Sequence, residues 1–167
     1  MVLIRPERPE DADAVRAVHR AAFDTDAESR LVDHLRDRGE AVVSLVAEVE
    51  GAVVGHVLFS PVSLVAPSGC REGLGLAPLA VLPAHQRGGV GSALVREGLA
   101  TCEKRGGAFV VVLGHPAYYP RFGFRRAGEV GLANEYGADE AFMVLELRPG
   151  ALPAEGGLVK YGPAFAE

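Results

Sequence analysis

The stretch that decides the fold is LAVLPAHQRGGVGSALVREGL, residues 79–99, in which three glycines stand directly before an apolar helical stripe. The apolar residues before Pro83 predict a buried strand, and those after Gly91 follow helical spacing. Where a strand gives way to a helix, free backbone N–H groups and the helix dipole favour an anion. Glycine also lets the backbone approach a ligand closely and adopt positive φ. The stretch therefore predicts a phosphate-binding loop at residues 88–91.

Three other interpretations of these glycines compete with that prediction. A nucleoside-triphosphate loop requires a lysine after its last glycine, and the sequence has none there. A dinucleotide loop requires G-x-G-x-x-G at the first strand, whereas GVGSAL at residues 89–94 supplies two glycines and follows half the chain. From these residues alone, a tight turn that binds no ligand is the third alternative.

The composition is that of an ordinary globular protein. The chain has 167 residues, 49 % of them hydrophobic and 23 % charged, which predicts a single domain over residues 1–167. A net charge of −5 argues against nucleic acid as a partner, because phosphate binding needs a concentrated basic face. Arg121, Arg125 and Arg126 are candidates for a local basic pocket.

The two cysteines and the N-terminus bear on location. Cys70 and Cys102 are too few for a disulfide framework or a four-ligand zinc site, so we expect a loop thiol, a core thiol and no metal. The N-terminal residues turn polar after Ile4 and lack the apolar segment of a signal peptide. No apolar run approaches the ~20 residues that cross a bilayer. We therefore expect a soluble, cytoplasmic protein with no membrane partner.

The rest of the pattern predicts alternating strands and helices. Each element ends at a turn or helix-stop signal, most often a glycine or a proline. We expect a strand at residues 2–5, helices at 9–22 and 27–38, a hairpin over 41–65 that turns at Glu50-Gly51, a loop at 67–73, a strand at 74–83, a helix at 92–105, a strand at 108–114, one helical turn within 116–124, a strand at 141–147 and a last strand near 158–161.

The order strand, helix, strand over residues 74–114 predicts a βαβ unit, whose two strands should lie parallel in one sheet. Pro78 cannot donate to a sheet ladder, so it predicts a bulge or a local parting of strands. The core should cover residues 2–148. The tail, 150–167, either completes the sheet or reaches a partner subunit in a homodimer.

Two segments carry a family resemblance. Residues 79–99 resemble the acetyl-CoA-binding segment of the GCN5-related N-acetyltransferases (the GNAT superfamily), whose signature [QR]-x-x-G-x-[GA] is matched by QRGGVG at 86–91. YYPRFGFRRAG at 118–128 is similar to the family segment in which a tyrosine, here Tyr119, stands four residues before Gly-Phe. Within the superfamily, LGHPAYYPRFGF at 113–124 is most similar to bacterial predicted acetyltransferases of the YhbS type.

The resemblance covers roughly residues 2–148 and implies both a fold and a donor. The implied fold is α/β (α+β by some schemes), a single domain with a mixed central sheet, splayed central strands and flanking helices. The implied cosubstrate is acetyl-CoA, with its pantetheine arm on the backbone of Leu79, Ala80 and Val81. The residues implied to hold its pyrophosphate are those of the loop: Gln86, Arg87, Gly88, Gly89, Val90, Gly91 and Ser92.

The implied reaction is acetyl transfer to a primary amine by direct attack on the thioester. A backbone N–H near Val81 would stabilise the oxyanion. Tyr119 matches the family's general acid, because a phenol with a reference pKa of about 10 can share its proton with a departing thiolate. Its neighbour Tyr118 is expected to pack.

Two positions depart from the family pattern. The glutamate that many relatives use as base falls on Gly75, which leaves Glu72, His115 or a water chain; His56 is expected to be structural or at the surface. An asparagine seven residues before the tyrosine falls on Val112, so its contact to pantetheine is lost or taken by His115. These departures support the alternative function, a non-catalytic CoA-binding regulatory or interaction module.

The sequence does not determine the acceptor. In the family, acceptor sites are built by the first helices, the loop after the hairpin and the C-terminal strands. Here those segments carry acids that would suit a cationic amine, or that serve only as solvated surface: Asp24, Asp26, Glu28, Glu72, Glu135, Asp139 and Glu140.

Overall fold

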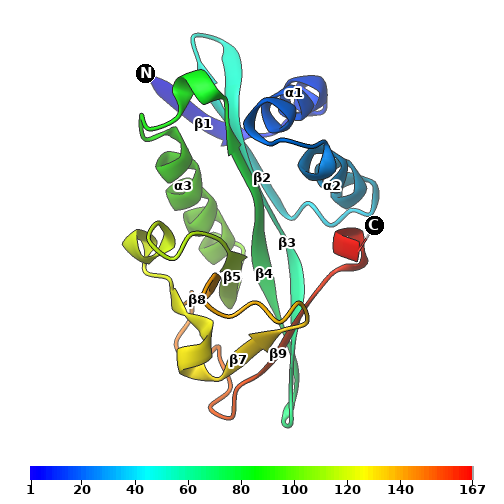
Figure 1. Ribbon diagram of the computed structural model, residues 1–167, viewed down its shortest axis with the longest axis vertical. Helices are drawn as coiled ribbons and strands as arrows, with labels where there is room; N and C mark the ends of the chain where they lie inside the picture. The colour runs from blue at the N-terminus through cyan, green and yellow to red at the C-terminus, as the bar shows by residue number, and fades with distance from the viewer. Residues whose placement is uncertain (167) are drawn as a thin grey trace. The chain divides into compact units, whose positions relative to one another are not determined.

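The computed structural model describes residues 1–166 and contains one nine-stranded mixed sheet and three α-helices (Figure 1). This confirms the predicted α/β class. The strands are β1 (Val2–Pro6), β2 (Val43–Val49), β3 (Ala52–Ala66), β4 (Gly69–Val81), β5 (Phe109–Leu113), β6 (Arg125–Arg126), β7 (Leu132–Asn134), β8 (Phe142–Glu146) and β9 (Gly157–Tyr161); the helices are α1 (Ala12–Ala22), α2 (Ala27–Asp37) and α3 (Val90–Lys104). Hydrogen-bonded neighbours follow the order β1-β2-β3-β4-β5-β8-β6, and β9 pairs with both β3 and β7.

Two compact units divide the described chain. The first comprises residues 1–59 and 77–101, and the second comprises residues 60–76 and 102–166. Strands β3 and β4 and helix α3 contribute residues to both units. The prediction of a single domain over residues 1–167 stays a prediction, and Glu167 lies outside the described residues.

In the first unit, β1, β2 and β3 form an antiparallel meander. The β2–β3 register runs from Val43 opposite Phe59 to Val49 opposite Ala52. The turn between these strands places Glu50 at φ 51° and Gly51 at φ 82°, the left-handed pair that matches strand twist in a two-residue hairpin. The predicted hairpin at Glu50-Gly51 is confirmed.

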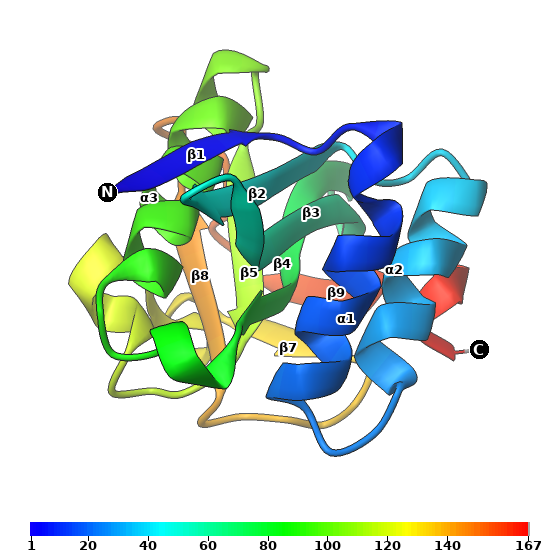
Figure 2. The same ribbon diagram turned by 90° about the horizontal axis from the view of Figure 1, so that it is seen from above.

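Helices α1 and α2 lie side by side in the same unit (Figure 2). Each carries an apolar stripe on one face: Val15 and Val18 of α1 and Val32 and Leu35 of α2 are at most 1 % exposed. Before α1, a 3-10 turn (Pro9–Asp11) begins where Asp11 accepts a 2.7 Å bond from the Arg8 backbone N–H. The predicted helix starts are therefore confirmed, with a short 3-10 turn added.

Helix α3 packs closely on β3 because two glycines leave room. A Cβ on Gly98 would lie 2.3 Å from the Phe59 ring, and one on Gly55 would lie 3.0 Å from Leu94 and 3.2 Å from Val90. Contacts this short leave no space for a side chain, so the two elements approach through backbone. The helix begins at Val90, two residues earlier than predicted.

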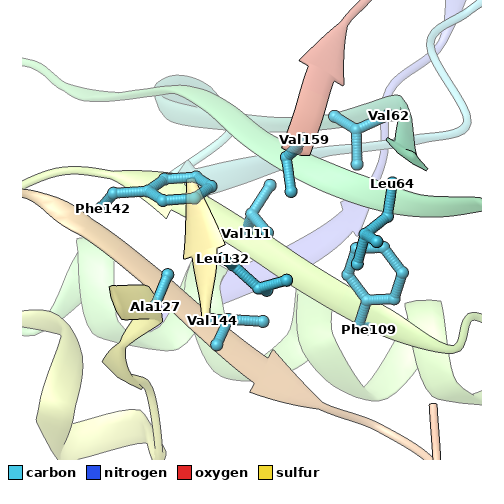
Figure 3. Close-up of a cluster of buried hydrophobic side chains, with 9 residues drawn as sticks. All are labelled: Val62, Leu64, Phe109, Val111, Ala127, Leu132, Phe142, Val144 and Val159. Atoms are coloured by element: carbon cyan, nitrogen blue, oxygen red, sulfur yellow. The ribbon is translucent and has the colours of Figure 1, made fainter. Parts of the chain in front are cut away.

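In the second unit, β5 is the central strand. It pairs in parallel with β4, Leu74 opposite Val110 and Gly75 opposite Val111, and antiparallel with β8 from Phe109–Glu146 to Leu113–Phe142. The predicted βαβ unit is thus confirmed. Strands β3, β5, β7, β8 and β9 and the turn after β6 contribute a cluster of nine buried apolar side chains, shown in Figure 3: Val62, Leu64, Phe109, Val111, Ala127, Leu132, Phe142, Val144 and Val159.

The described tail completes the sheet. Strand β9 pairs antiparallel with β3, Val62 opposite Tyr161, and parallel with β7, Leu132 opposite Gly157. The strands β6 and β7 were not predicted, because two or three residues are too few to show a period of two.

The predicted loop at residues 67–73 is wrong after its first two residues. Strand β3 continues to Ala66 and β4 begins at Gly69, so only Pro67 and Ser68 connect the strands. The cluster of proline, serine and glycine correctly indicated a turn. It could not show where the turn ends, since strand pairing, rather than local propensity, extends β4 over a glycine-rich segment.

Candidate active site

The end of β4 and the segment after it are fixed by two hydrogen bonds in the first unit. Leu82 N–H donates to the Val54 carbonyl at 2.8 Å, which ties the end of β4 to β3. The Gln86 side-chain Nε2 donates to the Val81 carbonyl at 2.9 Å, which folds the loop back on the strand. Between them, Pro83–His85 forms one 3-10 turn. The loop therefore leaves β4 in a defined direction.

The glycine loop has the backbone of an anion site. Arg87 has φ 66° and Gly89 has φ 89°, both left-handed. A Cβ on Gly89 would meet no atom within 4 Å, so the backbone angle, not space, requires glycine there. The first α-helical bond runs from Ala93 N–H to the Gly89 carbonyl at 3.0 Å, and the N–H groups of the first turn have no partner inside the helix. The structure brings together the sequence-predicted residues from Gln86 to Ser92 at this helix start.

Residues Leu79–Val81 are the last three residues of β4, shortly before that loop. Pairing of β4 with β5 covers Leu74 and Gly75 only, so Pro78 lies beyond it, as its missing N–H predicts. Ala80 and Val81 are buried, and Leu79 is partly exposed.

Tyr119 lies in the second unit, in a 3-10 turn (Tyr119–Phe122) shortly after β5. Its side chain is 7 % exposed, and its ring meets Phe124 edge-on at 5.6 Å between centroids. A Cβ on Gly114 would lie 2.3 Å from the Tyr119 ring, so glycine at the end of β5 leaves the space that the ring fills. Burial, with a smaller contribution from Tyr118, raises the pKa of Tyr119 to about 12. The phenol is therefore protonated at neutral pH.

The candidate bases lie in different settings. A Cβ on Gly75 would lie 3.0 Å from Val62 and 3.1 Å from the Tyr161 ring, so the place of the family glutamate is filled by other side chains. Glu72 is an exposed residue of β4 rather than of a loop. The exposed His115 accepts backbone bonds from Tyr118 at 3.0 Å and Tyr119 at 3.4 Å through its carbonyl. Val112, at the family's asparagine position, is 1 % exposed.

The three arginines proposed from the sequence as a basic pocket are all exposed, and each contacts a different partner. The Arg121 guanidinium lies 4.5 Å over the Tyr118 ring, which gives Tyr118 the predicted packing role. Arg125 pairs with Glu146 at 3.4 Å, and Arg126 pairs with Asp139 at 2.9 Å. No group of three or more His, Cys, Asp or Glu side chains within residues 1–166 could hold a metal. Cys102 is buried and Cys70 exposed.

Sequence reasoning missed a buried polar chain in the first unit. His19 Nε2 lies 2.8 Å from His56 Nδ1, and His56 Nε2 lies 2.8 Å from Ser44 Oγ. Ser44 Oγ donates to Glu7 Oε1 at 2.6 Å, and Arg36 bonds the other oxygen of Glu7. Both histidines are fully buried, so of the two settings expected for His56, structural or at the surface, the structure shows the structural one. The sequence signal for His19 is its place four residues after Val15, on the apolar stripe of α1.

The proton positions in this chain follow from its carboxylate end. Burial favours protonation of Glu7, but His56, Arg36 and Ser44 outweigh it and lower the pKa of Glu7 to about 2. Ser44 gives its one proton to Glu7, so it accepts from His56 Nε2, and His56 Nδ1 accepts from His19 Nε2. Burial, then His56 and Arg36, lower the pKa of His19 to about 3. His19 Nδ1 is therefore a buried lone pair, without a partner among the described residues.

Known proteins match this chain over most of its length. A model of the acetyltransferase (GNAT) domain matches residues 3–127. The uncharacterised N-acetyltransferase YhbS of Escherichia coli K12 is 42 % identical over 166 residues, 98 % of each chain. The crystal structure of Escherichia coli YhbS with CoA has a TM-score of 0.91 and 40 % identity, covering 99 % of this chain and 92 % of that one. A Brucella melitensis GNAT acetyltransferase with acetyl-CoA has a TM-score of 0.82 and 39 % identity, covering 99 % and 98 %.

The mixed sheet and the glycine loop between β4 and α3 are thus those of an acetyltransferase fold. The chain belongs to the GNAT family of N-acetyltransferases, and the predicted likeness to the YhbS type is confirmed. No helix within residues 1–166 is long and apolar enough to span a membrane.

Proposed function

We propose that this N-acetyltransferase uses acetyl-CoA and transfers the acetyl group to a primary amine by direct attack. The observation that carries the proposal is the loop of residues 86–92, whose left-handed Arg87 and Gly89 stand directly before the start of α3. Such a helix start binds phosphate oxygens. The Escherichia coli and Brucella melitensis relatives contain CoA and acetyl-CoA, which supports the same ligand here.

In this proposal the backbone of Leu79, Ala80 and Val81 holds the pantetheine arm, and the loop holds the pyrophosphate. The unprotonated amine attacks the thioester carbonyl carbon, which forms the C–N bond and moves the carbonyl π electrons onto oxygen. The N–H near Val81 stabilises this oxyanion. The oxyanion then collapses and the C–S bond breaks; the nitrogen loses its extra proton to water, and the thiolate of CoA takes a proton.

Tyr119 is the proposed source of the thiolate's proton. Because its pKa is raised to about 12, the phenol carries its proton throughout the neutral range and is never depleted as a donor. The same shift makes it a weaker acid than an ordinary tyrosine, so transfer of its proton to the less basic thiolate is uphill, and water returns a proton to the phenolate afterwards. Changing Tyr119→Phe removes the proton and keeps the ring, so kcat should fall while binding of acetyl-CoA persists. An unchanged kcat and pH profile would remove Tyr119 as the acid.

Water is the proposed acceptor of the amine proton. Tyr161 and Val62 crowd the Cβ position of Gly75, so the family's glutamate would fit there only if both side chains shifted. Glu72 and His115 are both exposed and are secondary candidates. Replacing either, Glu72→Gln or His115→Asn, should leave the pH profile of kcat/KM in place.

The donor site is tested by changing a backbone angle rather than a charge. Gly89→Ala forces a Cβ into φ 89° at the loop and should weaken acetyl-CoA binding in calorimetry by about tenfold. Gly39→Ala is the matched control, because Gly39 has φ 70° and equally open surroundings at the end of α2. Equal effects of the two changes, or no binding by the unchanged protein at millimolar acetyl-CoA, would contradict the proposal.

Location in the cytoplasm and a homodimer stay predictions. The pairing of β9 within its own chain gives the tail a role that needs no second subunit. Light scattering of the purified protein measures the mass in solution and decides between monomer and dimer.

A further inference from the structure

The described part of the tail brings a tyrosine ring over the strand that carries the donor-site residues. Tyr161 ends β9 opposite Val62 of β3, and its ring lies over Gly75 of β4, 3.1 Å from the place of a Cβ there. Gly75 stands four residues before Leu79 on the same strand. The ring therefore occupies the position that many relatives give to a catalytic glutamate.

Two more aromatic rings extend this surface. The centroid of the Tyr136 ring lies 5.7 Å from that of the Tyr161 ring, and the two rings are tilted by 43°. The centroid of the Phe165 ring lies 5.0 Å from that of Tyr161, with a tilt of 58°. Tyr136 is 52 % exposed and Tyr161 is partly buried, so the Tyr136 ring is accessible to a ligand from solvent. Together with Glu135 we call these residues the aromatic–carboxylate site.

The loop that holds Tyr136 is fixed by one buried side chain. Asn134, 5 % exposed, accepts from the N–H of Tyr136 at 2.9 Å and of Ala138 at 3.3 Å through Oδ1. Its Nδ2 donates back to the Ala138 carbonyl at 2.6 Å. The tyrosine is thus positioned before any ligand arrives, which lowers the entropy cost of binding.

Glu135 supplies a negative charge that the protein does not neutralise. Its Oε1 accepts from the Tyr161 backbone N–H at 2.8 Å, and no arginine, lysine or histidine of residues 1–166 pairs with it. Asp139, in the same loop, is by contrast paired with Arg126. The pKa values of Tyr136 and Tyr161 are raised, by burial first and also by the Glu135 charge, as expected for a carboxylate near both side chains.

We propose that the aromatic–carboxylate site binds a second, non-reacting cationic nitrogen of the acceptor, so that the substrates are diamines or longer polyamines. The proposal rests on the proposed acetyl transfer to an amine. Aromatic faces attract ammonium ions, and a carboxylate beside them adds ion pairing. These groups favour the charged form of whatever amine they hold. The nitrogen bound here therefore keeps its proton, and the other end of the molecule, deprotonated, attacks the thioester.

A series of acceptors tests the second cation directly. The full chain is assayed for thiol release from acetyl-CoA with α,ω-diaminoalkanes of increasing length and with n-alkylamines of matched length. We expect kcat/KM for the best diamine to exceed that of the matched monoamine by roughly tenfold, the order that one cation–π contact provides. Equal use of the two series would overturn the proposal.

Variants assign the preference to the site. Glu135→Gln keeps an oxygen for the Tyr161 N–H and removes the charge, and Tyr136→Leu removes an exposed ring. Both should lower kcat/KM for diamines and so bring the diamine-to-monoamine ratio near one. Tyr136→Phe keeps the ring and should keep the ratio. Glu129→Gln, the same charge change on an exposed residue outside the site, is the control. A ratio that survives Glu135→Gln and Tyr136→Leu in folded protein contradicts the assignment.

Failure of this inference can be told apart from failure of the proposed function. If no amine releases thiol, acetyl transfer to amines is refuted, and calorimetry of a diaminoalkane with wild-type and Glu135→Gln protein then tests the site alone. Binding that the variant loses supports the site, and absence of binding to the wild type overturns it. If monoamines and diamines are both acetylated at equal rates, only the second-cation site fails.

Discussion

Two buried clusters, one in each unit, stabilise this enzyme in opposite ways. The apolar cluster of the second unit brings nine side chains from distant segments together (Figure 3). Each of them could be replaced by another apolar side chain of similar volume, but not by a smaller or larger one. The polar chain of the first unit, from Glu7 through Ser44 and His56 to His19, depends on partners rather than volume. Removing one member leaves the next without a hydrogen bond, whereas removing a matched pair does not. The comparison teaches that burial alone does not predict how a substitution acts.

Phe109→Ala should have the largest effect. The fully buried ring contacts the apolar cluster and fills the space beside Gly73, where a Cβ would lie 2.4 Å from it. Its loss leaves a cavity that the sheet cannot close, and should lower the free energy of unfolding by about 3–5 kcal/mol. Urea unfolding measures this loss, provided that the dependence of the unfolding free energy on urea concentration is the same for the variant and the unchanged protein. Val65→Ala, at a 39 % exposed position of β3, is the control and should stay within about 0.5 kcal/mol.

Glu7→Ala tests the carboxylate end of the polar chain. It removes the acceptor of Ser44 and of Arg36, and should lower the free energy of unfolding by about 2–4 kcal/mol, since the partners remain buried. Asp13→Ala breaks an ion pair with Arg16 at a side chain that is 99 % exposed, and should cost almost nothing. Similar losses for the two variants would show that the chain is not a coupled network.

Acid should destabilise the protein through the polar chain, because the side chains of the apolar cluster do not titrate. The folded-state pKa of His19 is about 3 and that of His56 is lowered by burial, whereas an unfolded histidine titrates near 6.5. The unfolded state therefore binds more protons below pH 6.5, and stability should fall by about 1.4 kcal/mol per pH unit for each such histidine. The stabilising contribution of Glu7, pKa about 2, is lost only below pH 4.5. Unfolding free energies between pH 7 and pH 4.5 measure the histidines alone.

Removing both histidines together should have the smallest effect at pH 7. In the double variant His19→Leu, His56→Leu, no histidine nitrogen is left unpaired, and Ser44 keeps its bond to Glu7. We expect a change of about 1 kcal/mol or less, smaller than for His56→Leu alone, and a nearly flat dependence on pH down to 4.5. Additive losses from the single variants, or an acid dependence like that of the wild type, would contradict the tautomer assignment.

Short-range patterns predicted the parts of this protein that depend on neighbours along the chain. The glycine loop, the hairpin at Glu50-Gly51 and the helix over residues 27–37 were found from turn chemistry and periodicity, because backbone angles and helical spacing are local. Tyr119 was predicted as the general acid through the family resemblance, which rests on its spacing from Gly123-Phe124, and that role stays a prediction. The sequence also indicated that Pro78 ends ordinary pairing, since a missing N–H is a property of the residue itself.

Tertiary structure decided what depends on residues far apart in sequence. Strand β4 extends over the predicted loop because it pairs with neighbours, and Gly75 lies against Tyr161, 86 positions further on, where sequence showed only a missing base. His19 of α1, His56 of β3 and Glu7, which directly follows β1, join one polar chain because a helix packs on the meander of β1, β2 and β3. Hydrogen-bond partners and the charges around a buried core are set by this packing. The sequence by itself therefore predicted the glycine loop as the donor site, and only the fold showed that Tyr136, Tyr161 and Glu135 lie together.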